Sequence, residues 1–413
     1  MELMVPLDNQ SRLHLYEQIY QYMKEEIQSG RISAGSRLPS TRILAENLKV
    51  SRSTTQMAYE QLLSEGYIEA LPCKGYFVCR IEELVRVEKN ADEEFAENRS
   101  EKEMPYAVDF STRGIDLDSF PFNTWRKLSR NTLVDDNKEM FAVGDPQGEY
   151  ELRAAIRDYL HSARGVSCRP EQILVGAGSE YLLMLLSQLL GRETGIALEN
   201  PTYRQAYRVL KSLGHLVVPV KMDRYGMDVL DLEQSKTQAA YVMPSHQYPT
   251  GIVMPVKRRQ ELLSWAYRGE NRYVIEDDYD SEFRYKGKPI PALQGMDAHG
   301  KVIYLGTFSK SIAPAIRLSY MVLPEPLLAA YEKKNRFIHS TVSKVDQRIV
   351  QRFIEEGYYE RHLNKTRALY KGRHDALIEE LKPLLGTCRI SGEHAGVHLL
   401  LHFQNNETEE ELI

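Results

Sequence analysis

One highly charged stretch divides the chain. Residues 81–105 hold nine acidic and four basic side chains and show little apolar periodicity. A segment of this composition cannot bury enough apolar surface to offset the conformational entropy lost on folding. At 413 residues the chain is also too long for one ordinary core. We therefore expect two folded parts, residues 1–80 and 107–413, joined by a charged linker over residues 81–106.

The first part has the pattern of three helices followed by a β-ribbon. Apolar residues recur every four positions from Leu13 to Ser29, and short helices are expected from about Ser40 and from Ser51 or Arg52. The residues of these short helices expected to face inward are Ile43, Leu44, Leu48, Met57, Leu62 and Leu63. Strand patterns over residues 67–70 and 75–79 flank a turn. This order of elements predicts a winged helix-turn-helix, an α+β fold.

Basic and hydroxyl side chains gather at the start of the last of these helices. Residues 31–56 hold five basic residues and one acidic residue, although residues 1–80 as a whole are neutral. Hydroxyl groups and helix N-termini bind phosphates, and Arg and Gln side chains reach base edges. Ser and Thr are also ordinary N-cap residues, so any one of them fits an exposed helix start equally well.

Two stretches, "LPSTRILAENLKVSRSTTQMAYEQLLSEGYI" and "KGYFV", closely resemble the GntR family of bacterial transcription factors over about seventy residues. The resemblance implies contacts to double-stranded operator DNA, with the wing tip in the minor groove. The residues expected to contact DNA are Ser40, Arg42, Ser51, Arg52, Thr54, Gln56, Lys74 and Gly75.

From about Tyr106, short runs rich in Val, Ile, Leu and Tyr alternate with helical patterns. The strand patterns are "QILVGAG", "TGIALENP", "HLVVPVKM", "AAYVMPS", "RYVIEDDYD" and "KVIYLGTF". This alternation predicts an α/β layer fold with a mostly parallel sheet. The most apolar run, residues 181–190, is too short to span a membrane and is expected to be a buried helix.

Unusual side chains follow four of these predicted strands, where open α/β sheets bind ligands. They are, in chain order, Ser179, Glu180, Tyr203, Asp277, Tyr279, Thr307, Ser309, Lys310 and Arg317. Pyridoxal 5′-phosphate needs an amine for its aldehyde, a carboxylate for its ring nitrogen, a flat neighbour and donors for its phosphate. Each residue alone fits a surface turn, an ion pair or the core, but together they match this cofactor.

Residues 107–413 resemble fold-type I aminotransferases, and the whole chain resembles the MocR/GabR-type regulators of the GntR family. The matching motifs are "IEDDYDSEFRY", "IPALQ" and "YLGTFSKSIAPAIRLSYMVLP". The resemblance implies that Lys310 forms the Schiff base, Asp277 pairs with the pyridinium, Tyr279 donates to the ring phenolate and Tyr203 stacks on the ring. It implies that the phosphate is held by Ser179, the N–H of Glu180, Thr307, Ser309 and Arg317. It also implies a homodimer.

Three features depart from these families. In "HQYPTG", Tyr248 stands where aminotransferases carry an asparagine, a change typical of this subfamily. Gln205 stands where members sensing γ-aminobutyrate have an arginine. The families also continue well past "GVHLLLHF" and there carry an arginine for a substrate carboxylate, so we expect this chain to be a fragment or a truncated product.

Three functions fit these patterns. We favour a transcriptional regulator that senses an amino compound through external aldimine formation at Lys310. An active aminotransferase with an accessory DNA-binding domain is the main alternative, and a winged-helix protein whose second domain only dimerises is the third. The four cysteines are scattered and the N-terminus shows no secretory signal, so we expect a cytoplasmic protein without a metal site.

Overall fold

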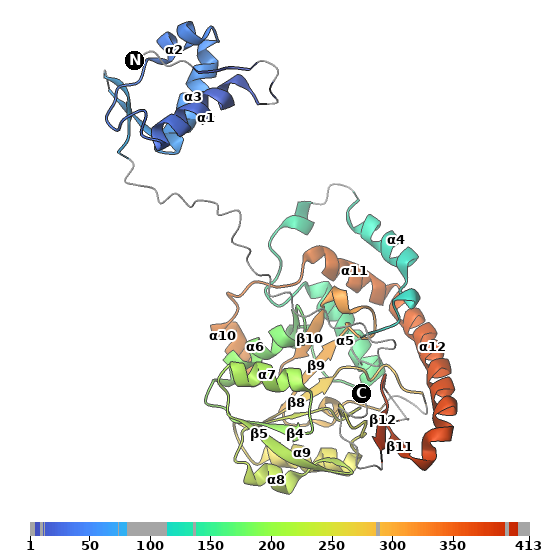
Figure 1. Ribbon diagram of the computed structural model, residues 1–413. Helices are drawn as coiled ribbons and strands as arrows, with labels where there is room; N and C mark the ends of the chain where they lie inside the picture. The colour runs from blue at the N-terminus through green and yellow to red at the C-terminus, as the bar shows by residue number, and fades with distance from the viewer. Residues whose placement is uncertain are drawn as a thin grey trace. The chain divides into compact units, whose positions relative to one another are not determined.

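A computed structural model describes residues 5–8, 11, 13–72, 74–80, 114–134, 138–285, 290–392 and 396–403. The chain forms two compact units, residues 1–109 and 110–413, and each is described by itself (Figure 1). The predicted linker over residues 81–106 lies outside the described residues. Within the described ranges, no helix is long and apolar enough to cross a membrane.

The first unit has the predicted order of elements. Its helices are α1 (Leu15–Gln28), α2 (Thr41–Leu48) and α3 (Arg52–Ser64), and β1 (Ile68–Leu71) pairs antiparallel with β2 (Gly75–Val78). Side-chain oxygens of Ser40 and Ser51 cap α2 and α3 by accepting from the third backbone N–H that follows each of them. Three helices and a two-stranded wing confirm the predicted winged helix-turn-helix.

The inward faces of the two short helices differ in part from the prediction. Ile43 is 51% exposed and Met57 is 47% exposed, so the prediction that both face inward is wrong. Leu44 and Leu62 are buried as predicted, Tyr59 joins them in the core, and Ile43 and Met57 fall on the outer face.

The second unit is built on an eight-stranded sheet in the order β3-β10-β9-β8-β7-β4-β5-β6. The strands are β3 (Ile173–Gly176), β4 (Ile196–Asn200), β5 (Val217–Asp223), β6 (Gly226–Met227), β7 (Ala239–Val242), β8 (Tyr273–Asp278), β9 (Val302–Thr307) and β10 (Ser319–Val322). Strands β5, β4, β7, β8 and β9 pair in parallel, while β10 is antiparallel to both β9 and β3. The predicted mostly parallel sheet is confirmed, and β6 and β10 were not predicted.

Helices cover both faces of this sheet, as a parallel sheet requires. They are α4 (Phe122–Thr132), α5 (Tyr150–Arg164), α6 (Ser179–Leu190), α7 (Arg204–Ser212), α8 (Val229–Gln234), α9 (Val256–Tyr267), α10 (Glu325–Lys334), α11 (Lys344–Glu355) and α12 (Tyr358–Leu381). The predicted buried helix over residues 181–190 lies within α6, which packs on one face with α7 and α10. A small antiparallel pair, β11 (Cys388–Ser391) and β12 (Leu400–Phe403), follows α12.

Candidate functional site

All nine predicted cofactor residues lie at one edge of the large sheet. Strands β3, β4, β8 and β9 run in the same direction, because β10 is antiparallel to both β9 and β3. Their carboxyl ends therefore share an edge. Gly176, Ser319 and Thr307 are partners in register across β3, β10 and β9, so the loops after β3 and β9 are neighbours.

The loop before α6 and the end of β9 form a polar corner suited to an anion. Gly178, the N-cap of α6, has φ of +96°, and a Cβ there would lie 2.2 Å from a guanidinium nitrogen of Arg317. The N–H groups of the first turn of α6, from Ser179 onward, have no partner within the helix. Thr307 Oγ1 accepts from the backbone N–H of Ser309 at 3.1 Å. The Arg317 guanidinium and the free N–H groups of α6 are donors of the kind that a phosphate dianion needs.

Arg317 is paired with a neighbouring carboxylate in this structure. Its Nη2 lies 2.8 Å from Oε2 of Glu180. Burial pushes the pKa of Glu180 upward, but a backbone N–H and Arg317 together hold that pKa below its ordinary value. A phosphate bound in this corner would contact the same guanidinium. It would therefore share Arg317 with Glu180 or displace the carboxylate of Glu180.

Asp277 is a buried carboxyl group near the end of β8. Burial raises the pKa of Asp277 to about 7, and a hydrogen bond from the hydroxyl of Tyr241 opposes part of that rise. A buried carboxylate with one phenol as its side-chain donor is stabilised by an adjacent cation. The protonated nitrogen of a pyridine ring supplies such a cation, so this group fits the predicted role.

Lys310 lies just beyond the end of β9, and burial lowers the pKa of its amine, with a smaller opposing effect from Asp280. A lowered pKa leaves more of the amine neutral and nucleophilic.

Three tyrosine rings lie at the same edge. Tyr203 and Tyr248 are perpendicular with centroids 5.9 Å apart, and the rings of Tyr248 and Tyr279 lie 6.3 Å apart. Amine, carboxylate, aromatic rings and phosphate donors together fit pyridoxal 5′-phosphate.

The sequence did not predict a cluster of His246, Asp280 and His398 beside Tyr279. His246 Nδ1 lies 2.9 Å from Asp280 Oδ2 and 3.1 Å from the Tyr279 hydroxyl, and the ring of His398 is 4.7 Å from that of His246. The ligand atoms of the three residues lie within 4.8 Å of one another, a spacing that could hold a metal ion. No local spacing predicted this cluster, because the three residues are far apart in sequence. The "HQYPTG" and "DDYD" motifs, which contain His246 and Asp280, were the sequence signal that could have pointed to it.

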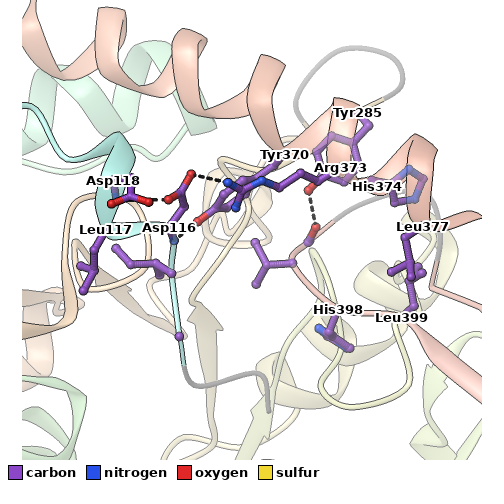
Figure 2. A pocket seen from close by; sticks show the side chains of 14 residues that line it. Asp116, Leu117, Asp118, Tyr285, Tyr370, Arg373, His374, Leu377, His398 and Leu399 are labelled. Carbon is purple, nitrogen blue, oxygen red and sulfur yellow. Dashed lines mark hydrogen bonds and ion pairs between the residues drawn. The ribbon is translucent and has the colours of Figure 1, made fainter. Parts of the chain in front are cut away.

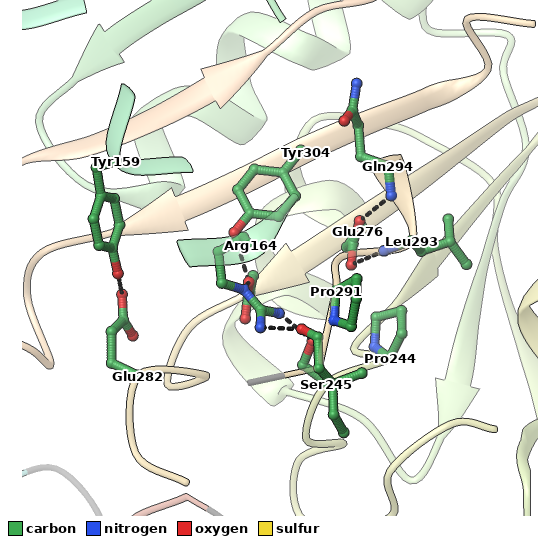
Figure 3. A network of polar contacts seen from close by, with 12 residues as sticks. Tyr159, Arg164, Pro244, Ser245, Glu276, Glu282, Pro291, Leu293, Gln294 and Tyr304 are labelled. Carbon is green, nitrogen blue, oxygen red and sulfur yellow. Dashed lines mark hydrogen bonds and ion pairs between the residues drawn. The ribbon is translucent and has the colours of Figure 1, made fainter. Parts of the chain in front are cut away.

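A buried polar network beneath the edge anchors β8, and it was also not predicted (Figure 3). Arg164 pairs with Asp278 at 2.8 Å and donates to Ser245 Oγ at 2.6 Å. Both oxygens of Glu276 accept backbone N–H groups, from residues 293 and 294, at 2.8 Å. Burial raises the pKa of Glu276 to about 7. The network fixes the strand that carries Asp277.

The predicted DNA-contacting residues lie on the surface of the first unit. Seven of them are exposed and Thr54 is half-buried. The hydroxyls of Ser40 and Ser51 serve as helix caps here, and Arg42 pairs with Glu46 at 3.1 Å with both side chains largely exposed. Gly75, at the start of β2, has φ of +102°. Arg37 was not among the predicted contacts, yet its guanidinium lies beside Gly75 and adds a positive charge there.

Comparisons with known proteins agree with both units. Residues 15–78 match the model of bacterial regulatory proteins of the gntR family, and residues 113–413 match the model of aminotransferase class I and II. The HTH-type transcriptional regulator YhdI of Bacillus subtilis is 40% identical, and the alignment covers 98% of this chain and 87% of that protein. The rhizopine catabolism regulatory protein MocR of Rhizobium meliloti is 32% identical over 97% of this chain and 84% of its own length.

Among solved structures, a multiple substrate aminotransferase from Thermococcus profundus is similar with a TM-score of 0.62 and 28% identity. The match covers 68% of this chain and 72% of that one. The aminotransferase class I and II fold implies pyridoxal 5′-phosphate as the cofactor of the second unit.

Proposed function

This chain belongs to the MocR type of GntR-family transcriptional regulators, in which a helix-turn-helix unit is joined to an aminotransferase class I and II domain, and on that premise we propose that its Lys310 site detects an amino compound and thereby alters binding to operator DNA. The observation that carries the proposal is the presence, in one chain, of a DNA-binding unit and of a lysine, a buried carboxyl group and an anion-binding corner at one sheet edge.

The residues at the edge have separate tasks under this proposal. When bound, pyridoxal 5′-phosphate supplies an aldehyde carbon that primary amines attack. Lys310 supplies the resident amine, and its lowered pKa favours exchange with an incoming amine. Asp277 holds the ring nitrogen protonated, and Arg317, Ser179, Glu180 N–H, Thr307 and Ser309 keep the phosphate in place. Tyr203 stacks on the ring and Tyr279 donates to its phenolate.

On the DNA side, we propose that Arg52 and Gln56 reach base edges from the start of α3 and that the hydroxyls there meet phosphates. Lys74 and Gly75 would enter the minor groove. We also propose that two chains form a homodimer, which brings two DNA-binding units to paired half-sites, and that the protein works in the cytoplasm.

A spectroscopic screen tests the sensing step. Full-length protein loaded with pyridoxal 5′-phosphate is titrated with amino acids and simple amines while its long-wavelength absorbance band is recorded. We expect one class of amine to shift the band and to change protection of the chain's own promoter region in a footprint. Lys310→Ala removes the band, while Lys257→Ala, an exposed lysine of the same unit, leaves it unchanged.

Transamination is a second candidate function, favoured by the presence of a cofactor-binding lysine and carboxylate together. Steady-state conversion of an amino donor and a keto acid by the loaded protein would support it.

Absence of sequence-specific DNA protection, with or without pyridoxal 5′-phosphate, would overturn the sensing proposal.

A further inference from the structure

Helix α12 contacts two places that the proposed function has to connect. One is the loop that carries Lys310 after β9, and the other is the segment by which the chain enters this unit, residues 114–119. We propose that α12 couples these two places, so that loading of the cofactor site changes how the entering segment is held. This inference rests on the proposed function, because it names the element that transmits its signal.

The first turns of α12 hold the residue next to Lys310. The Tyr359 hydroxyl donates a hydrogen bond of 2.9 Å to Ser311 Oγ, and His362 Nε2 donates one of 2.9 Å to the Ser311 carbonyl oxygen. Ser311 and Tyr359 are each 2% exposed. Both the side chain and the backbone of the residue after Lys310 are therefore held by α12. A displacement of the Lys310 loop would move the start of α12, and the reverse also holds.

The middle of α12 holds the loop that follows β8. Nε of Arg367 donates a 2.6 Å hydrogen bond to the carbonyl oxygen of Glu282, and the Tyr370 ring packs on Phe283 with centroids 5.1 Å apart. This loop begins with Tyr279, directly after β8. The helix thus contacts both chain segments that carry proposed cofactor residues on β8 and β9.

The next turns of α12 hold the entering segment (Figure 2). The Tyr370 hydroxyl accepts a 2.9 Å hydrogen bond from the backbone N–H of Asp116, and Nη2 of Arg373 pairs with Asp116 Oδ2 at 3.0 Å. The other carboxylate oxygen of Asp116 caps the short 3-10 helix over Leu117–Ser119. The first turn of this unit that the structure describes is therefore attached to α12 through one aspartate.

The residues that make these contacts share one face of the helix. Tyr359, His362, Tyr370 and Arg373 are spaced by three, eight and three positions, and the helical period places them in one stripe. The stripe is about 21 Å long at 1.5 Å per residue. A pocket of about 620 Å³, lined in part by Asp116, Tyr370 and Arg373, borders this region and leaves room for a small displacement. Packed helices transmit such displacements as rigid bodies.

Hydrogen exchange on the full chain tests the coupling directly. Cofactor-free protein is compared with protein loaded with pyridoxal 5′-phosphate, and loading is verified by absorbance. We expect exchange in residues 114–119 to become at least about threefold slower on loading. In His362→Ala the cofactor still binds and this slowing is lost. His362→Gln, which keeps a side-chain N–H donor, restores it.

A matched control lies on the same helix. Glu379→Gln breaks an exposed ion pair with Lys382 (2.6 Å) that involves neither loop, and we expect it to keep the wild-type response. The coupling is overturned if wild-type exchange in residues 114–119 does not change on loading. It is also overturned if His362→Ala and Glu379→Gln respond alike.

Operator binding separates this inference from the proposed function. In Arg373→Met, whose side chain is 60% exposed in the wild type, we expect the effect of pyridoxal 5′-phosphate on operator affinity to shrink by at least about fivefold. If the amine that shifts the absorbance band leaves wild-type operator affinity unchanged while the exchange response is present, the coupling stands and the proposed sensing function fails. An unaltered cofactor effect in Arg373→Met counts against the coupling.

Discussion

At the scale of single residues, the chemistry of Asp277 is strongly altered by its place in the fold. Burial raises the pKa of this carboxyl group to about 7, and Tyr241 limits the rise. In the cofactor-free protein the raised pKa means that Asp277 contributes stability at low pH that is lost as the pH rises from about 4 towards 7. Binding of a pyridinium has the opposite dependence, because it needs the carboxylate.

The affinity for pyridoxal 5′-phosphate should therefore fall as the pH drops below about 7, and Tyr241→Phe should move this fall to higher pH. Removing the hydroxyl removes the group that lowers the pKa of Asp277, so the carboxylate is protonated earlier. Dissociation constants measured by absorbance between about pH 6 and pH 9 check this. Tyr273→Phe, at the other end of β8, should leave the pH dependence unchanged; an equal shift in both variants would contradict the explanation.

At the scale of elements, periodicity predicted most helices and strands but not their long-range pairing. Residues 15–28 are helical as expected, and the predicted helix over residues 181–190 lies within α6, since apolar spacing is local information. Strand β10 was missed, because it owes its place to partners on β3 and β9. The same reason hid the contacts of Arg164 and His246, whose partners lie on other elements.

The two ends of α6 offer a matched pair of glycines. Gly178 and Gly191 both have positive φ, +96° and +84°, but only at Gly178 would a Cβ meet Arg317, since nothing lies within 4 Å of the Cβ position at Gly191. Each change to alanine should cost about 1–3 kcal/mol of stability through backbone strain. Only Gly178→Ala should also weaken cofactor binding, by about tenfold or more, because it displaces the guanidinium.

Titration of both glycine variants with pyridoxal 5′-phosphate, alongside thermal unfolding, separates strain from loss of the anion site. Equal cofactor affinity in the two variants would show that the loop before α6 does not hold the phosphate.

At the scale of the whole molecule, the net charge of −5 hides the charge distribution that matters for DNA. The first unit presents exposed Arg37, Arg42, Arg52 and Lys74 around the start of α3 and the wing. The sequence predicted Arg42, Arg52 and Lys74 as DNA contacts, and the structure leaves all three side chains exposed. The buried site was harder to predict in detail, since its pKa values depend on surroundings contributed by distant segments.

Replacing a single basic side chain of this surface should change DNA binding in a way that shows whether that side chain contacts phosphates or bases. Lys74→Ala should weaken binding to all sequences and lower the slope of log K against log salt concentration by about one. Arg52→Ala should cost about 1–3 kcal/mol and relax sequence preference. Lys257→Ala removes an equal charge from the second unit and should leave affinity and slope unchanged. A similar loss in all three variants would point to a general charge effect.

The pairing of β10 between β9 and β3 has a consequence for the order of events on the ribosome. The anion corner needs Gly176 and Ser319 side by side, so a nascent chain cannot form it until β10 has emerged. The last strand of the first unit ends at Val78. At about 5–20 residues per second, translation leaves an interval on the order of tens of seconds between the two. The helix-turn-helix unit of each new chain can therefore fold before the proposed cofactor site exists. Each chain is first a regulator without bound cofactor.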